Sequence, residues 1–266
     1  MDEVTGRDIT ETGEAGSAVL YLFSPDGHFV GRVSVTGEQI VHRAPVLLPV
    51  EALDRCHVST WTNAGAGQLF HSPAQGSEIE ERAVSLIEGE DTFHGTPDDL
   101  FFGHARLAPV GAAGPEVITL ARKNARMRIT VRGLDRRIPE DRYYLTVEIP
   151  NDGYDFVGNP IAGTARVRRT GAFHDNGDFS TDEAFNLIHT DPAVSPAGGV
   201  TVNLYEKALG RSADRLIASV TDDDGRPISL PAGRTVNLLI DLNEGEGLSV
   251  YTEITPWDEI YQWDIW

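Results

Sequence analysis

The sequence predicts an all-β protein built from two β-sandwiches, and three observations lead to this prediction. Apolar and polar residues alternate with a period of two along most of the chain, whereas helical periodicity is scarce. Turn-forming sequences such as Pro-Asp-Gly and Asp-Asn-Gly separate the alternating runs. The 266 residues are enough for roughly one to two domains with sizeable cores. Many short strands at this spacing are typical of β-sandwiches.

The strand pattern is clearest in two segments. In residues 125–131, apolar residues alternate with Arg126, Arg128 and Thr130, and residues 143–149 alternate in the same way. We expect both segments to be antiparallel strands with one polar face. The other predicted strands cover residues 19–23, 29–35, 45–50, 57–62, 104–110, 117–121, 166–170, 200–205, 216–220, 235–241, 248–254 and 260–265.

Turns and short helices are expected to connect these strands. Residues 79–88 and 182–189 are the two stretches that resemble helices, and Ser180 and Thr181 are possible N-caps of the second. Residues that tolerate positive φ predict turns at 25–27, 151–153, 175–177 and 224–225.

The clearest candidate boundary between domains is the small-residue stretch Gly-Ala-Ala-Gly-Pro at residues 111–115. Linkers of this composition commonly separate folded domains. The sequence therefore predicts an N-terminal β-sandwich domain at residues 1–114 and a C-terminal β-sandwich domain at residues 115–266.

Charge and cysteine content exclude several classes of protein. Lys and Arg number 22 against 41 Asp and Glu, so the formal net charge is -19 and we expect no nucleic-acid partner. One cysteine, Cys56, leaves no internal disulfide. No run approaches the ~18 apolar residues of a membrane-spanning helix. Without a leader sequence at Met1, we expect either a cytoplasmic protein or one whose targeting segment is missing here.

Motifs of common enzymes are absent from the sequence. It contains no nucleotide-binding loop, zinc-protease helix, nucleophile elbow or paired CxxC, so we predict no catalytic residues and no cofactor. The eight histidines never fall at the spacing that places two metal ligands on one helical face. Acidic clusters at residues 175–178 and 222–225 are expected to form turns, with calcium binding as the alternative.

Aromatic residues are concentrated at the carboxyl terminus. Trp257, Tyr261, Trp263 and Trp266 lie within the last ten residues, and the first three would share one face of an extended strand. Three interpretations are open. The segment could be a final core strand, a platform on which sugar rings stack, or a strand that pairs with a neighbouring subunit.

Six segments follow one another in an order that has a counterpart in a known family. They are LYLFSPDGHFV at residues 20–30, VSTWTN at 58–63, DDLFFG at 98–103, ITLARKNARMRITVRGL at 118–134, YDF at 154–156 and DG at 224–225. In this order they resemble the FimB-type fimbrial anchor family, the outer-membrane lipoproteins at the base of type V pili. The resemblance spans about residues 18–242.

The resemblance implies two tandem transthyretin-like Greek-key β-sandwich domains with short connecting helices and no enzyme activity. It also implies that the protein lies at the cell surface, held in the outer membrane by an N-terminal lipid, and binds fimbrial stalk subunits by strand exchange or addition. Two features depart from the family pattern. Cys56 lies inside a predicted strand and is a poor match to the lipidated cysteine, and residues 1–17 show no recognisable first strand.

Residues 248–266 are the segment that we expect to contact the first stalk subunit, because a terminal strand is well placed for exchange. The alternative is a surface glycan-binding β-sandwich protein that uses the carboxyl-terminal aromatics. A hydrolase is a third option, and it would need two carboxyl groups about 5–10 Å apart in a cleft. The expected partner-binding residues are Leu248, Val250, Ile254, Trp257, Tyr261, Trp263 and Trp266.

Overall fold

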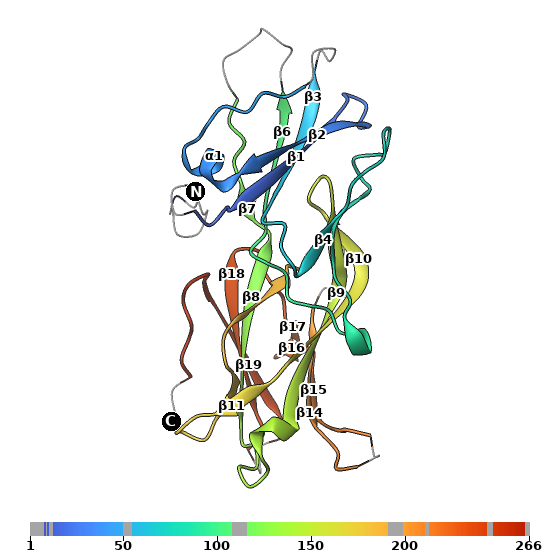
Figure 1. The fold of residues 1–266 in the computed structure, drawn as a ribbon. Helices are drawn as coiled ribbons and strands as arrows, with labels where there is room; N and C mark the ends of the chain where they lie inside the picture. The colour runs from blue at the N-terminus through green and yellow to red at the C-terminus, as the bar shows by residue number, and fades with distance from the viewer. Residues whose placement is uncertain are drawn as a thin grey trace. The chain divides into compact units, whose positions relative to one another are not determined.

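The computed structural model confirms a nearly all-β protein (Figure 1). Its chain forms two compact units, and the polypeptide passes between them several times. Unit 1 comprises Met1–Ile87, Pro97–Asn124 and Gly153–Ile161, and unit 2 comprises Glu88–Thr96, Ala125–Asp152 and Ala162–Trp266. The structure describes residues 8, 10, 13–49, 55–107, 116–190, 199–210, 213–243 and 247–263. The predicted domain boundary at residues 111–115 lies outside these ranges, so the division into residues 1–114 and 115–266 stays a prediction.

Unit 1 is built on a five-stranded sheet. Its strands are β1 (Ser17–Phe23), β2 (Phe29–Thr36), β3 (Cys56–Thr62), β6 (Phe101–Leu107) and β7 (Ala121–Arg122). They lie in the order β2-β1-β3-β6-β7, so β1 is flanked on both sides and pairs antiparallel with β2 and β3 along nearly its whole length. The predicted turn between β1 and β2 is confirmed, and Gly27 adopts a φ of 83° there.

The sheet of unit 1 is covered on both faces. On one face, Leu20, Leu22 and Val58 form a core against which partly buried residues such as Val46 and Ile118 pack. The other face carries Trp61, which packs on Tyr154 and Phe102 at ring-centroid distances of 5.2 and 4.8 Å. Short strands β4 (Gln68–Phe70) and β5 (Arg82–Leu86) and the end of β9 (Tyr143–Asp155) complete this unit.

Helical structure is sparse in the described residues. It comprises α1 (Gly37–Val41), which Thr36 caps, and the 3-10 turns Glu90–Thr92 and Glu140–Arg142. No helix in these ranges is long and apolar enough to cross a membrane.

Both helices predicted from the sequence are wrong. Within residues 79–88 the chain forms β5, because Val84 and its neighbours pair with β4 and β9 and bury their side chains. Within residues 182–189 the chain forms β13 (Phe185–Ile188), which pairs with β8 (Asn124–Arg132). Ser180 and Thr181 belong to β12 (Phe179–Thr181) rather than to a helix N-cap. Tertiary pairing outweighs local helix propensity in both segments.

Three predicted strands also differ from the structure. Residues 45–49 form no strand, consistent with Pro45 and Pro49 having no N–H to donate to a ladder, and residue 50 lies outside the described ranges. Of residues 117–121 only Ala121 is in a strand, at the start of β7. Residues 260–263 follow a turn and form no strand, while residues 264 and 265 lie outside the described ranges.

The turn predicted at residues 151–153 is wrong as well, because Asn151 and Gly153 lie inside β9. Gly153 stands opposite Ser85, and a Cβ at this glycine would collide with the carbonyl oxygen of Val84. Gly153 therefore serves the close approach of two strands and not a reversal of the chain. Turns at residues 175–177 and 224–225 are confirmed, with a φ of 94° at Gly177.

Unit 2 contains most of the remaining strands. One sheet places β9 between β14 (Thr201–Glu206) and β10 (Pro160–Arg169), with β15 (Arg215–Val220) beyond β14. A second sheet has the order β11-β12-β8-β18-β19, where β11 is Gly171–Phe173, β18 is Arg234–Asp241 and β19 is Ser249–Pro256. The core side of this sheet carries fully buried residues of β8 and β18, among them Met127, Ile129, Leu238 and Ile240.

An ion-pair network holds the residues that precede β1. The Arg122 guanidinium donates to both carboxylate oxygens of Asp99 at 2.8 Å and to Glu14 at 2.7 Å. Asn63, with a φ of 59°, donates to the carbonyls of Glu14 and Asp99 and accepts from the N–H of Gly16. We call Glu14, Asn63, Asp99 and Arg122 the amino-terminal clamp.

Unit 1 should become less stable as the pH falls from 7 to 5.5. Burial lowers the pKa of His71, with Arg82 as a second cause, and burial lowers the pKa of His104, with His57 as a second cause. The unfolded chain, where histidine titrates near about 6.5, then binds more protons than the folded chain, so stability is lost as the pH drops below that value. Urea midpoints at the two pH values measure this loss. The double variant His71→Gln/His104→Gln should show a smaller loss, and an unchanged pH dependence would contradict the assignment.

Candidate partner-binding edge at the carboxyl terminus

Strand β19 lies at the edge of its sheet and pairs antiparallel with β18 over its whole length (Figure 1). Three apolar side chains of this segment are about half exposed, at 47% for Leu248, 49% for Tyr251 and 47% for Ile254. An edge strand with exposed apolar residues is a template for pairing with another chain unless other groups protect it. This edge is therefore the candidate surface for contact with a partner.

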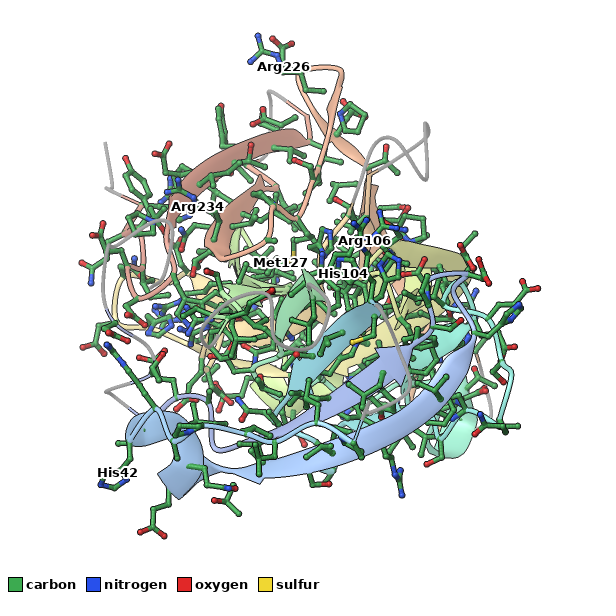
Figure 2. All side chains as sticks on the ribbon, turned by 90° about the horizontal axis from the view of Figure 1, so that it is seen from above. His42, His104, Arg106, Met127, Arg226 and Arg234 are labelled. Carbon is green, nitrogen blue, oxygen red and sulfur yellow. The ribbon has the colours of Figure 1, made fainter. Side chains whose placement is uncertain are left out.

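A carboxylate protects the middle of this edge. Asp223 accepts hydrogen bonds from the backbone N–H of Thr252 at 2.9 Å and from its hydroxyl at 2.6 Å. Asp223 belongs to a hairpin of β16 (Asp222–Asp223) and β17 (Arg226–Pro227), and Figure 2 shows Arg226 at the tip of that hairpin. An incoming strand that paired at Thr252 would have to replace the Asp223 carboxylate.

The chain after β19 folds back over the outer face of the same sheet. The Trp257 carbonyl accepts from the hydroxyl of Thr235 at 2.7 Å and from Arg126 at 3.2 Å. The N–H of Tyr261 donates to the side-chain oxygen of Asn237 at 3.2 Å. Arg126 and Thr235 are paired in register, and Asn237 lies on the same face of β18. This covering explains why the polar residues Thr235 and Asn237 are fully buried.

The aromatic residues of this segment have different environments. Trp257 is only 6% exposed, and the Arg126 guanidinium lies 5.2 Å from its ring centroid. Tyr261 and Trp263 meet edge to face at 4.8 Å with an interplanar angle of 71°. Tyr251 lies 6.5 Å from Trp263. Rings set at such an angle do not form a flat platform for a sugar, so the geometry gives the glycan-binding alternative no support.

The structure brings most of the predicted contact residues into one region. Leu248, Val250 and Ile254 lie on or just before β19, whereas Trp257 is packed against its own sheet. The remaining predicted residues, Tyr261 and Trp263, lie in the folded-back segment, and Trp266 lies outside the described residues.

Sequence reasoning missed two residues of this edge, Tyr251 and Asp223. Tyr251 falls on the polar side of the expected alternation, and Asp223 was assigned to a turn. The sequence gives no sign of the contact between Asp223 and Thr252, because these two residues are 29 positions apart.

In the described ranges, no three His, Cys, Asp or Glu side chains are arranged to hold a metal ion. The acidic cluster at residues 222–225 instead forms the β16–β17 turn, in which the Gly225 N–H donates to Asp222 at 2.9 Å. In the cluster at residues 175–178, Asp178 forms an ion pair with Arg132 at 3.1 Å.

Comparison with known proteins supports the family resemblance. The family model described as fimbrillin-A associated anchor proteins Mfa1 and Mfa2 matches residues 1–263. The major fimbrium anchoring subunit FimB of Porphyromonas gingivalis strain ATCC 33277 is 25% identical over 269 residues, which cover 97% of this chain and 84% of that protein. Another FimB of the same species is 26% identical over 270 residues, with coverages of 96% and 83%.

A solved structure shows a similar fold. The fimbrial anchor protein Mfa2 from Porphyromonas gingivalis has a TM-score of 0.65 to this chain at 14% identity. The match covers 92% of this chain and 90% of that structure.

Proposed function

Because this chain belongs to the family of fimbrillin-A associated anchor proteins Mfa1 and Mfa2, we propose that it is an anchor or accessory subunit of a fimbrium and works without catalysis. Membership of an anchor family implies a place at the cell surface and association with fimbrial stalk subunits. The proposed mechanism is adhesion through buried surface and strand pairing, so no residue has a catalytic role.

The observation that carries the mechanism is the exposed apolar edge of β19. A strand from a stalk subunit that added to this edge would gain main-chain hydrogen bonds, and its alternate side chains would contact Leu248 and Ile254. Tyr251, Tyr261 and Trp263 would border the same contact. Trp257 is buried against β8 and β18, so it would hold the segment on its own sheet and would not touch the partner.

A substitution on β19 tests this mechanism. Ile254→Lys should lower the amount of stalk subunit that co-purifies with the tagged protein from its native cells by about tenfold or more, because a lysine on an edge strand opposes pairing. Leu216→Lys is the matched control, since Leu216 is 51% exposed and lies on β15, an edge strand of the other sheet in unit 2. Equal retention of the stalk subunit by both variants would rule out β19 as the contact.

Point variants are preferable to deletion of residues 248–266. Deletion removes eight residue pairs between β18 and β19 and uncovers Thr235 and Asn237. Loss of the stalk subunit after deletion would therefore combine a lost contact with a damaged sheet.

Asp223 gives a prediction of the opposite sign. Asp223→Ala should increase the amount of stalk subunit that the protein retains when the stalk subunit is limiting, because the N–H of Thr252 is then open to an incoming strand. Asp223→Asn keeps an acceptor for this N–H and should behave like the unmodified protein. A decrease in retention with Asp223→Ala would show that the β16–β17 hairpin contributes to the contact with the stalk subunit instead of blocking the edge of β19.

Attachment to the outer membrane through an N-terminal lipid is part of the same proposal. Cys56 does not supply the lipid site, because its side chain is buried in β3 and burial raises the pKa of its thiol, with Glu116 as a second cause. Mass spectrometry of the protein from native membranes tests the attachment. A lipid-modified cysteine ahead of residue 1 is the expected result, and a mature chain with an unmodified amino terminus would contradict it.

A further inference from the structure

A pocket of about 780 Å³ lies in unit 2, where the chain leaves β10 and continues into β11 of the other sheet. Its walls come from residues 168–170 at this crossing and from residues 181–186, with Thr96 at one side. Residues 182–184 lie between β12 and β13, two short strands that both pair with β8. A ligand pocket typically has a volume of about 300–1,000 Å³.

Two arginines, Arg168 and Arg169, lie in the wall of this pocket, and Arg169 is the one with an open donor. Its guanidinium stacks on Phe185 at 4.8 Å from the ring centroid, and its Nη1 donates a 3.5 Å hydrogen bond to the carbonyl of Arg168. The buried Nε atom has no hydrogen-bond partner. Burial also lowers the pKa of Arg169.

No carboxylate forms an ion pair with Arg169 among the described residues, although the chain has 41 acidic residues against 22 basic ones. The neighbouring Arg168 is engaged elsewhere, since its guanidinium lies 3.9 Å from the centroid of the Tyr144 ring. A partly buried cation without a counter-charge, whose buried Nε has no acceptor, is costly in the free protein. An anionic ligand would remove this cost and satisfy the open donor.

The rim of the pocket restricts the kind of anion. Asp182 and Glu183 are exposed there, so two negative charges at the rim offset the charges of Arg168 and Arg169 in the wall. A multiply charged phosphate or sulfate would be repelled by this rim. Carboxylates on the rim are acceptors for hydroxyl groups, and Thr96 and Thr170 add hydroxyls of their own. A ligand with one carboxylate and several hydroxyls matches all of these groups.

We propose that this pocket binds a carboxylated sugar, with the carboxylate on Arg169 and the sugar hydroxyls on the rim residues Asp182 and Glu183. The site is separate from the β19 edge. It uses an arginine and rim carboxylates, and does not depend on the carboxyl-terminal aromatics. The proposed stalk contact and this pocket can therefore fail or succeed independently.

Isothermal titration with D-glucuronate, which has one carboxylate and several hydroxyls, tests the proposal on the full chain, with D-glucose as the neutral counterpart. The unmodified protein should bind glucuronate saturably and glucose at least about tenfold more weakly, as expected for loss of a charge-assisted hydrogen bond. Absence of saturable binding, or equal affinity for the two sugars, would overturn the proposal. Sulfate that binds as tightly as glucuronate would show a general anion site and overturn the assignment to sugars.

Variants connect the binding to Arg169. Arg169→Gln should weaken glucuronate binding by about tenfold or more, while Arg169→Lys should retain part of it because the charge remains. Arg137→Gln is the surface control, since Arg137 is 91% exposed and should bind like the unmodified protein. Thermal unfolding of each variant verifies that it is folded. Unchanged affinity in folded Arg169→Gln would contradict the role of this arginine.

Discussion

Replacing Arg122 by alanine should lower the free energy of unfolding of unit 1 by about 3 kcal/mol. The Arg122 side chain is only 5% exposed and neutralises both Asp99 and Glu14. Its removal takes the guanidinium away from two partly buried carboxylates, and it also removes the contact of this guanidinium, 4.8 Å away, with the Phe101 ring. Urea denaturation followed by circular dichroism measures the change.

Arg137→Ala is the matched control for this experiment. Arg137 also forms a bidentate ion pair with Asp135, from Nε to Oδ1 and from Nη2 to Oδ2, but it is on the surface, where such pairs contribute little to stability. We expect no measurable change for this variant. Equal denaturation midpoints for Arg122→Ala and Arg137→Ala would mean that the amino-terminal clamp does not stabilise the fold.

Trp257→Ala should destabilise unit 2 by about 3 kcal/mol, in the range of large-to-small substitutions in a core. Trp257 is 6% exposed and its ring packs on Arg126. Its main-chain carbonyl accepts a hydrogen bond from Thr235, where the chain turns back over the sheet. Trp263→Ala, at a partly exposed ring that contacts Tyr251 and Tyr261, should cost less than about 1 kcal/mol. The difference appears as a shift of the urea midpoint for the first variant alone.

This pair of variants separates two interpretations of the carboxyl-terminal aromatics. A Trp257 that acted only as an exposed contact would leave stability unchanged when removed. The structure instead makes it part of the packing of its own sheet, as in the core-strand interpretation, although it lies in a turn after β19 and not in a strand. Ile254 and Tyr251, which are about half exposed, remain the residues to test for a partner.

The all-β character was predictable from sequence because strands with one polar face show an alternation of apolar and polar residues with a period of two. In β8, Met127, Ile129 and Val131 are fully buried, while the alternating residues Arg126 and Arg128 lie on the opposite face. Sharp turns were equally readable, since Gly27 and the other turn glycines at positive φ are the residues that such turns require.

One strand that buries both faces, β13, could not be predicted in this way. Leu187 and Ile188 are adjacent in β13 and both fully buried, so no period of two marks the strand. Gly153 shows the same limit for turns, because an Asn-Asp-Gly sequence meets local turn requirements while the actual constraint is the proximity of Val84 on another strand. Contacts between distant segments decided each of these cases.

The position of the edge strand β19 was predictable from the sequence, but the contacts that cover it were not. Exposed apolar residues at 248–254 follow from the alternation of a terminal strand, and the family resemblance indicates a partner. The Asp223 carboxylate that covers the N–H of Thr252 comes from a hairpin that the sequence shows only as a turn. The pocket beside Arg169 depends on where the chain passes from β10 to the other sheet. Neither arrangement has a local pattern that could reveal it.

The central position of β1 in its sheet has a mechanical consequence. Traction applied ahead of Ser17 would pull β1 along its own axis between β2 and β3. Hydrogen bonds on both flanks would then share the force in shear and rupture together, whereas a terminal strand at a sheet margin can peel away one bond at a time. With Glu14 fastened by Arg122 and Asn63 just before β1, unit 1 has the geometry of a tether point that resists extension.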